Sequence, residues 1–177
     1  MAEHRGSEIV MGGSILAIRS ASKTRPANTT TYTAGDVIAE ATSGATGLTF
    51  TDAVRQLGGS GLINKVQIVD SAYVAATLQA ELWLFSATVT ADQDNAVFTP
   101  TDAELATLVA VITVNTAFVG DATAGVGGNV SLTSGNVNTV MKCAPDSTTL
   151  YGVLVARNAY VPISGEIFTV QLFISQD

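Results

Sequence analysis

Apolar residues recur at every second position in several segments of the chain, and this spacing predicts β-strands. The central example opens on the glycine turn at Gly58 and continues to Asp70, then resumes after a polar break from Leu78 to Phe85. The apolar positions that share one face of these segments are Val66 and Ile68, followed by Ala80, Leu82 and Leu84. We therefore expect the two segments to form the middle of a sheet.

The last third of the chain carries the clearest strand patterns. The run from Leu150 to Ala156 is almost continuously apolar, which is typical of a strand covered on both faces. Between Glu166 and Ser175 the pattern alternates, with four apolar residues on one face: Phe168, Val170, Leu172 and Ile174. Together with shorter patterns elsewhere, the spacing predicts about eight or nine strands in an all-β, antiparallel β-sandwich of jelly-roll-like form.

One short helix is expected among the strands. Thr101 is followed three residues later by Glu104, the spacing of a capping box, in which the threonine hydroxyl accepts from the backbone amide of the glutamate. The run from Leu108 to Val114 is rich in β-branched residues and favours a return to strand. A glycine-rich segment from Gly120 to Gly128 predicts a long loop.

Residues 1–30 differ from the rest and predict an extended N-terminal arm in front of a β-sandwich domain at residues 31–177. Between Ser20 and Thr33 the chain is mostly Ser, Thr, Asn, Ala and Pro, a composition that buries little by itself. One strand from Ser14 to Arg19 is expected within the arm. The first 35 residues hold four basic and two acidic residues, whereas the remainder holds four basic and thirteen acidic ones. Alternatively, this basic arm packs against its own acidic body.

Composition narrows the range of functions. Hydrophobic residues make up 47% of the chain and charged residues 13%, with many of the β-branched residues that favour strands. The net charge of −7 opposes binding to a phosphate backbone, so no nucleic-acid partner is expected. The longest apolar stretch, Leu105 to Gly120, is broken by polar residues and shorter than the roughly 20 residues of a membrane span. No membrane association is expected, and the first 19 residues show no secretory signal.

Residues for nucleophilic or metal chemistry are few. The single histidine, His4, and the single cysteine, Cys143, are too little for a catalytic triad or a zinc site. We interpret Cys143 as a small buried thiol. The glycine groups near Gly58 and Gly125 lack the lysine of a phosphate-binding loop and predict tight turns instead.

Carboxylates are the remaining candidates for chemistry. Asp36 with Glu40, and Asp92 with Asp94, stand in turn-like sequence without the aromatic platforms that accompany a glycosidase pair. The segment Asp92–Asn95 resembles the start of a calcium loop but lacks its glycine and distal glutamate, so we expect a solvated loop. The sequence therefore predicts a protein that is not an enzyme and that holds no cofactor.

A series of motifs follows in order along residues 31–175. They are Thr31-Tyr32-Thr33-Ala34-Gly35-Asp36-Val37-Ile38, Arg55-Gln56-Leu57-Gly58-Gly59-Ser60-Gly61, Leu82-Trp83-Leu84-Phe85, Asn95-Ala96-Val97-Phe98-Thr99-Pro100-Thr101-Asp102-Ala103-Glu104 and Leu150-Tyr151-Gly152-Val153-Leu154-Val155-Ala156-Arg157. In order and spacing these motifs resemble a family of small virion structural proteins of tailed bacteriophages, which includes capsid decoration, or cement, proteins.

The resemblance implies a non-enzymatic protein that forms oligomers on a viral shell. We expect it to decorate and stabilise a phage capsid by binding over junctions of the major capsid protein, with a homotrimer favoured. Its location is then the capsid surface of the virion, after assembly in the host cytoplasm. The expected docking element is the arm, which orders on an acidic capsid surface through its basic residues Arg5, Arg19, Lys23 and Arg25.

Two alternatives remain open. Within virions, the chain is instead a tail, neck or fibre component. From another class, it is a carbohydrate-binding β-sandwich, which predicts exposed aromatic residues around a groove, with Trp83, Tyr73 or Tyr160 as candidates. For Trp83 a core position is favoured, because it lies within an apolar strand.

Overall fold

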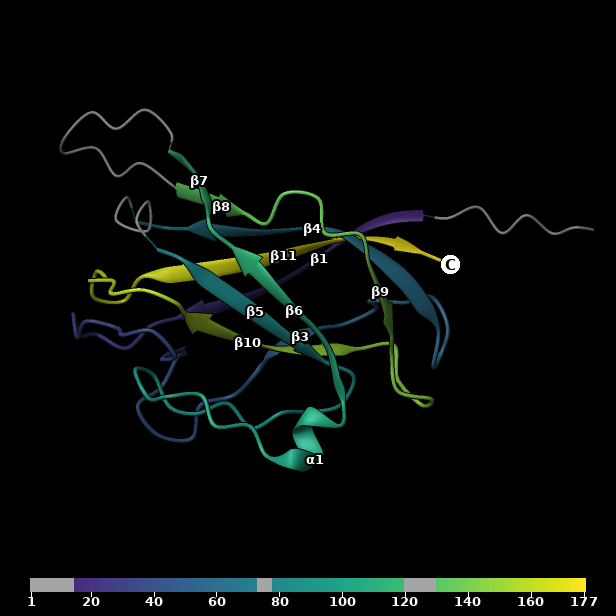
Figure 1. The fold of residues 1–177 in the computed structure, drawn as a ribbon, viewed down its shortest axis with the longest axis horizontal. Coiled ribbons are helices and arrows are strands. Elements are labelled where there is room, and N and C mark those ends of the chain that lie inside the picture. Colours follow the sequence, from purple (N-terminus) through teal and green to yellow (C-terminus); the bar gives the residue numbers. More distant parts are fainter. Residues whose placement is uncertain (1–14, 73–77, 120–129) are drawn as a thin grey trace, which may run out of the picture.

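The chain folds almost entirely into β-strands, as its alternating pattern predicts. The computed structural model describes residues 15–72, 78–119 and 130–177. The elements in chain order are β1 (Ile15–Thr24), β2 (Val37–Ile38), β3 (Leu48–Phe50), β4 (Ser60–Asp70), β5 (Ala80–Phe85), α1 (Asp102–Leu105), β6 (Leu108–Val114), β7 (Thr116–Val119), β8 (Val130–Thr133), β9 (Thr139–Lys142), β10 (Leu150–Ala156) and β11 (Ile167–Gln176). Figure 1 shows these strands stacked in two layers.

The strands form two antiparallel sheets with the order of a jelly roll. The six-stranded sheet has the order β1-β11-β4-β8-β7, with β9 also paired to β4. The five-stranded sheet has the order β2-β10-β5-β6, with β3 also paired to β10. Successive strands thus tend to alternate between the sheets, and the first and last strands are neighbours, as in a jelly roll. The predicted all-β, antiparallel sandwich is confirmed.

The structure has more strands than the eight or nine expected because two neighbours of long strands are divided. β8 and β9 pair with opposite ends of β4, and β2 and β3 pair with opposite ends of β10. Between β8 and β9 the chain turns at Gly135 and Asn138, both of which have positive φ. If each divided partner is counted as one strand, the number is close to the prediction.

Inward-facing residues of the long strands make the core between the two sheets. The predicted face of β11 is fully buried, with Phe168, Val170, Leu172 and Ile174 all at 0% exposure. The strands β4 and β5 bury their apolar alternate positions, as their pattern predicts. The expectation that they form the middle of one sheet is wrong, because β4 belongs to the six-stranded sheet and β5 to the five-stranded sheet.

The N-terminal region differs from the expected arm. The strand predicted from Ser14 to Arg19 continues to Thr24, and all ten residues of β1 pair with β11. Residues 15–24 therefore belong to the six-stranded sheet, as its edge strand. The physical reason is that β11 offers a free ladder of backbone hydrogen bonds, which an extended polar segment can satisfy without a large apolar face. Of the proposed arm, residues 1–14 lie outside the described residues.

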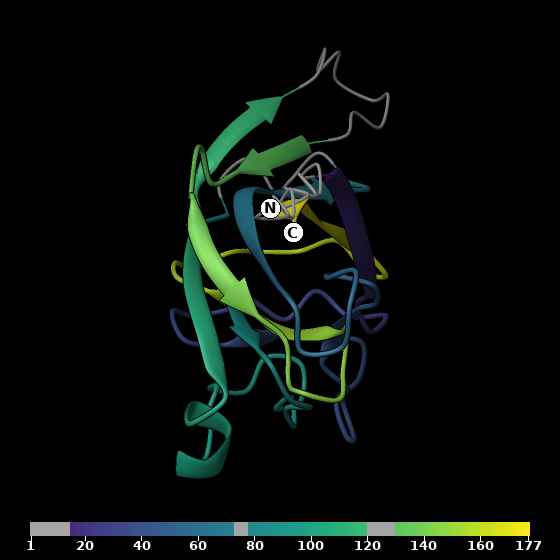
Figure 2. The same cartoon turned by 90° about the vertical axis from the view of Figure 1, so that its right-hand side faces the viewer.

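The helix forms where the capping box predicts it. The Thr101 side chain accepts from the Glu104 backbone, and the Glu104 side chain accepts from the Thr101 backbone amide. The chain then returns to strand in β6, as expected, and crosses to the other sheet in β7. Figure 2, turned by 90°, shows α1 at the end of the molecule remote from β1 and β11. The loop expected at Gly120–Gly128 falls largely outside the described residues.

A substitution at Gly61 tests how closely β4 packs against its neighbouring strands. A Cβ atom at this position would lie 2.9 Å from the backbone oxygen of Ser175 and 2.9 Å from the terminal methyl of Met141. We expect Gly61→Val to lower the free energy of unfolding by about 1–3 kcal/mol, because the added bulk overpacks a filled site. Urea unfolding measures the change.

The control is Ser20→Val, which adds similar bulk on the exposed face of β1. This variant should unfold within about 0.5 kcal/mol of the wild type, as surface substitutions usually do. Equal stability of the Gly61 variant and the wild type would contradict the described β4–β11 register.

Candidate interaction surface

Arg25, one of the expected docking residues, is buried inside the sandwich. Its Nη2 atom lies 3.1 Å from Oδ2 of Asp94, and both side chains have 0% exposure. Asp94 also accepts from the Tyr32 hydroxyl at 2.5 Å and from the Ala39 amide at 3.1 Å. A buried charge of this kind requires a partner and further hydrogen bonds to offset its lost hydration. The expectation that Asp92–Asn95 is a solvated loop is therefore wrong for Asp94.

Two stacked tyrosines extend this polar network through the core. The rings of Tyr32 and Tyr160 lie 6.2 Å apart at an interplanar angle of 11°. The Tyr160 hydroxyl donates to Glu166, which is itself buried. Burial, followed by the bonded carboxylate, raises the pKa of each tyrosine well above its ordinary value, so both remain hydroxyl donors. The network ties buried groups of the fold together. Because the Tyr160 ring is buried within it, this ring offers no exposed surface on which a sugar could stack.

Lys23 is held by a second ion pair with the same chain. Its Nζ atom lies 2.8 Å from Oε2 of Glu40 and donates to the Thr46 hydroxyl at 2.9 Å. Burial raises the pKa of Glu40, but the bonds from Lys23 and Thr46 outweigh burial and lower it from 4.5 to about 2. Both Lys23 and Arg25 thus bind the acidic body of their own chain, which is the alternative that the sequence left open.

The other expected docking residues are placed differently. Arg19 is half-buried and donates from Nε to the backbone oxygen of Asp52 at 2.7 Å. Arg5 lies outside the described residues. The structure therefore does not gather the four basic residues into one exposed group, because alternate positions of β1 point toward the inner side of the sheet.

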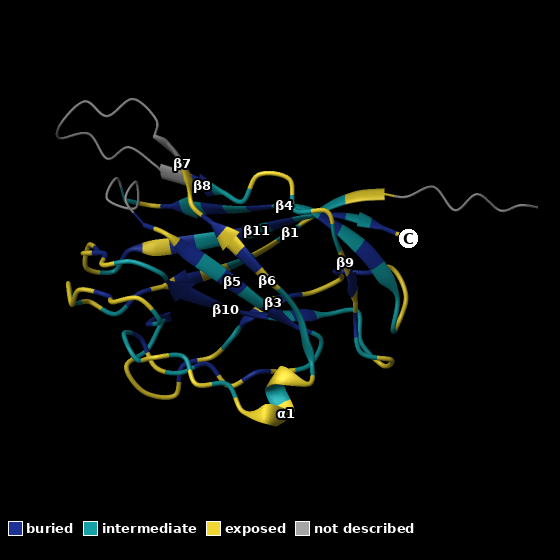
Figure 3. Ribbon diagram, in the orientation of Figure 1, coloured by how far each residue is buried: buried dark blue, intermediate teal, exposed yellow. Residues whose placement is uncertain are grey.

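An apolar belt crosses the outer face of the six-stranded sheet. We define it by Leu16 and Ile18 of β1, Phe173 of β11, Leu62 of β4 and Val140 of β9. The register places Leu16, Ser175, Leu62 and Val140 in one row, with Ile18, Phe173 and Lys65 in the next. Figure 3 shows the first part of β1 as exposed.

Three members of the belt are well exposed to solvent. The exposed fractions are 64% for Leu16, 50% for Ile18 and 73% for Val140, while Leu62 and Phe173 are half-buried. The following row of the same face is polar and consists of Ser20, Gln171, Gln67 and Thr133. Beyond this polar row the outer face has Val69 and the exposed Ile167, so the belt is separated from them by polar side chains. A group of exposed apolar residues of this kind is a candidate interaction surface.

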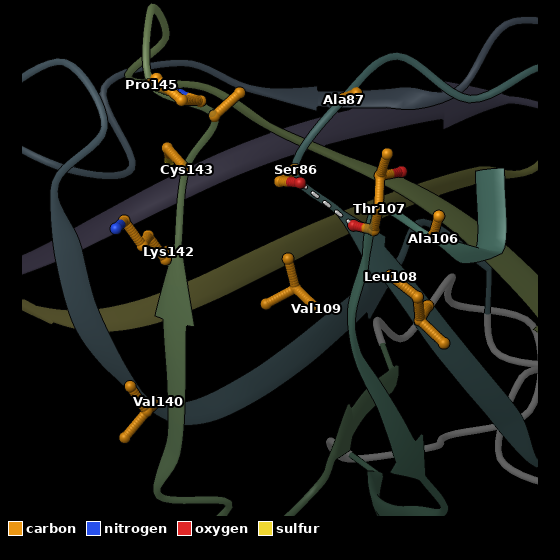
Figure 4. A pocket seen from close by; sticks show the side chains of 11 residues that line it. Ser86, Ala87, Ala106, Thr107, Leu108, Val109, Val140, Lys142, Cys143 and Pro145 are labelled. Atoms are coloured by element: carbon orange, nitrogen blue, oxygen red, sulfur yellow. Dashed lines mark hydrogen bonds between the residues drawn. The ribbon is translucent and has the colours of Figure 1, made fainter. Parts of the chain in front are cut away.

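A groove opens beside the belt, between the edge strands β6 and β9. It encloses about 570 Å³ and is lined on one side by Val140, Lys142 and Cys143 and on the other by Thr107 and Val109. Figure 4 shows these walls, with the Ser86 hydroxyl bonded to the Thr107 carbonyl at 3.2 Å. Cys143 is buried, as expected, and burial raises the pKa of its thiol to about 11. A thiol of this kind is a poor nucleophile at neutral pH.

The described residues contain little that could perform catalysis or bind a sugar. Within residues 15–72, 78–119 and 130–177, no group of three His, Cys, Asp or Glu side chains could hold a metal ion. Of the aromatic candidates, Tyr160 is 2% exposed, and Trp83 packs edge-to-face on Phe98 at 5.4 Å. Tyr73 lies outside the described residues. None of the helices in the described parts is long and apolar enough to cross a membrane.

The fold and surface define a class: a jelly-roll sandwich with an exposed apolar belt on its six-stranded sheet. No protein-family model matches the chain, and no curated protein matches it significantly. A structure of Desmodium yellow mottle tymovirus is similar over 92% of this chain and 81% of that chain, with 13% identity and a TM-score of 0.27. A structure of Triatoma virus is similar over 98% and 72%, with 12% identity and a TM-score of 0.26. Both TM-scores are too low to support a function.

The buried pair of Arg25 and Asp94 should contribute strongly to stability. We expect Arg25→Ala to lower the free energy of unfolding by about 3–5 kcal/mol, because it leaves the Asp94 carboxylate buried without its charge partner. The matched control is Arg157→Ala, which removes the partner of Glu81 from a pair whose side chains are 34% and 22% exposed. That loss should be about 0–1 kcal/mol. Chemical unfolding measures both, and equal losses would contradict the buried position of Arg25.

The ion pair of Lys23 and Glu40 predicts a dependence of stability on pH. The folded pKa of Glu40 is about 2 against an ordinary 4.5, so the stabilisation is present above pH 4.5 and is lost as pH falls toward 2. We expect Glu40→Gln to reduce the loss of stability across this range. Urea unfolding at a series of pH values measures the slope, and an unchanged slope in the variant would contradict the prediction.

Proposed function

We propose that the chain is a non-enzymatic structural protein of a virion, in which its jelly-roll body joins other subunits. The observation that carries the proposal is the apolar belt, with Leu16, Ile18 and Val140 each at least half exposed. Single exposed apolar residues are common on monomeric proteins, but a group spread over four neighbouring strands is explained by a covering protein. The motifs that resemble tailed-phage virion proteins support the same role.

The more specific form of the proposal is a capsid decoration protein. On this view the protein binds over junctions of the major capsid protein, stabilises the shell, and acts as a homo-oligomer, with a trimer favoured. The rigid sandwich supports it, because the buried network around Arg25 joins the end of β1 to the loop before α1. A body that keeps its shape can hold neighbouring shell subunits at a fixed spacing.

A tail, neck or fibre component would use the same kind of surface. Its position in the particle would distinguish it from a capsid decoration protein. Carbohydrate binding has less support, because Tyr160 is buried and none of the residues that line the groove between β6 and β9 is aromatic.

Cryo-electron microscopy of particles assembled with and without the protein tests the proposal. We expect additional density over junctions of major capsid subunits, and shells that withstand a higher temperature when the protein is bound. Density on the tail would support the alternative component instead. If purified virions are found not to contain this protein, the proposed virion role is overturned.

The docking role of the N-terminal arm is retained as a proposal for Arg5 and Arg19, because Lys23 and Arg25 bind their own chain. Deletion of residues 2–14 leaves β1 and its pairing with β11 intact. We expect this deletion to weaken the binding of purified protein to undecorated capsids, measured by co-sedimentation. The control is Arg5→Ala alone, which should weaken binding less. Undiminished binding of the deleted chain would overturn the arm's role.

A further inference from the structure

Two of the basic residues that form no ion pair within the described residues lie beside the apolar belt. Within the described residues, the ion pairs are Lys23 with Glu40, Arg25 with Asp94, and Arg157 with Glu81. The other basic side chains there are Arg19, Arg55, Lys65 and Lys142.

Two of these four cations, Lys65 and Lys142, flank the belt on the outer face of the sheet, whereas Arg19 points to its inner side. Lys65 stands in a row of the belt, with its Nζ atom 4.0 Å from the centre of the Phe173 ring. Lys142 pairs with Ser60 at the start of β4, next to the pair of Val140 with Leu62. Arg55 lies in the loop that leads into β4, and Arg19 is on β1. Asp52 and Asp177 also lie nearby, but neither forms an ion pair with these cations. A protein of net charge −7 therefore has a locally basic and apolar face.

A complementary surface lies around α1. Three acidic residues, Asp92, Asp102 and Glu104, lie on α1 or in the loop before it. Of these, Asp102 is exposed. Exposed apolar residues accompany them, since Leu105 is 40% exposed and Val97 is 59% exposed. Around α1 the chain therefore presents an acidic and apolar face.

The belt face and the α1 face lie on either side of the groove between β9 and β6, whose walls include Val140 and Lys142 on one side and Ala106 and Thr107 on the other. Figures 1 and 2 show α1 at the lower end of the molecule, with β1 and β11 above it. Glu104 joins α1 to the loop at Thr90, since its side chain accepts from the Thr90 amide at 2.7 Å. This bond keeps the acidic face in place relative to the sandwich. Within the described residues, no ion pair joins a basic residue of the belt face to an acidic residue of the α1 face, although the charges of the two faces are opposite.

We infer that the belt face of one copy binds the α1 face of a second copy, in a head-to-tail contact between identical chains. Such a contact uses two different surfaces, so it closes into a ring or continues as an open array. Closure after three copies would give the trimer favoured for the proposed capsid protein. The inference rests on that proposed function for its role in the virion, but the contact itself forms between purified copies.

Variants that block one face each test the head-to-tail contact. Lys65→Glu/Lys142→Glu reverses the charge of the belt face and leaves α1 unchanged. Asp102→Arg/Ala103→Arg reverses one charge of the α1 face, adds a positive charge at the neighbouring exposed position, and leaves the belt unchanged. We expect wild-type chains to associate, and each variant alone to sediment at the monomer mass of 18.2 kDa. A mixture of the two variants retains one intact pair of faces and should associate to at least twice the monomer mass. Analytical ultracentrifugation measures all of these masses.

A matched pair of substitutions on β1 separates the belt from the rest of its face. Ile18 and Ser20 lie two residues apart on the same exposed face, and Ser20 is in the polar row. Ile18→Glu should abolish association, whereas Ser20→Glu should leave it within about twofold of the wild type. Circular dichroism and the thermal midpoint verify that each variant is folded.

Three outcomes would overturn the inference: a monomeric wild type, variants that associate as the wild type does, or a mixture that stays monomeric. Association should also weaken as salt screens the charges, and salt-independent association would count against the assigned faces. If copies fail to associate but still decorate capsids, only the head-to-tail contact is lost. If copies associate but are absent from virions, the proposed function is lost instead.

Discussion

The alternation along β11 is the constraint on which the rest of the structure depends. This strand lies between β1 and β4, and its register sets the face on which each neighbouring residue lies. Its even-numbered positions build the core, with Phe168, Val170, Leu172 and Ile174 fully buried. Its odd-numbered positions form the outer face, where Phe173 becomes part of the apolar belt. A shift of one residue would exchange the two faces, so the core and the belt have a single physical origin.

The buried network at Arg25 holds the end of the edge strand β1 against the rest of the sandwich. Edge strands carry unpaired backbone groups and invite association with other chains. Here the chain leaves β1 and places Arg25 in the interior, where Asp94 and Tyr32 bind it. Lys23 adds a second tie to Glu40. These charges serve the single chain, whereas Lys65 and Lys142, which form no ion pair within the described residues, stand beside the belt.

The jelly roll does not by itself define a function, because one fold carries many functions. The surface is more informative here. Within the described residues, carboxylates and hydroxyls form capping, turn and ion-pair contacts, and they do not converge on a common cavity with nucleophiles or bases. Exposed apolar residues, by contrast, include those of the belt, beside Lys65 and Lys142, and those around α1, beside Asp92 and Asp102. A surface of this kind is suited to binding protein partners in a defined orientation, which is what a shell component requires.

Sequence alone determined the local features of this protein. Alternation predicted the strands and the class of sandwich, and the spacing of Thr101 and Glu104 predicted the helix, because neighbouring residues decide strand faces and helix caps. Tertiary structure decided the features that join distant residues: Arg25 meets Asp94 across 69 positions, and the belt takes side chains from four strands. Periodicity says which face of a strand is apolar, but it does not say which strands lie side by side. The extent of β1, the division of strands beside β4 and β10, and the interaction surface all depend on that long-range pairing, so only the folded chain reveals them.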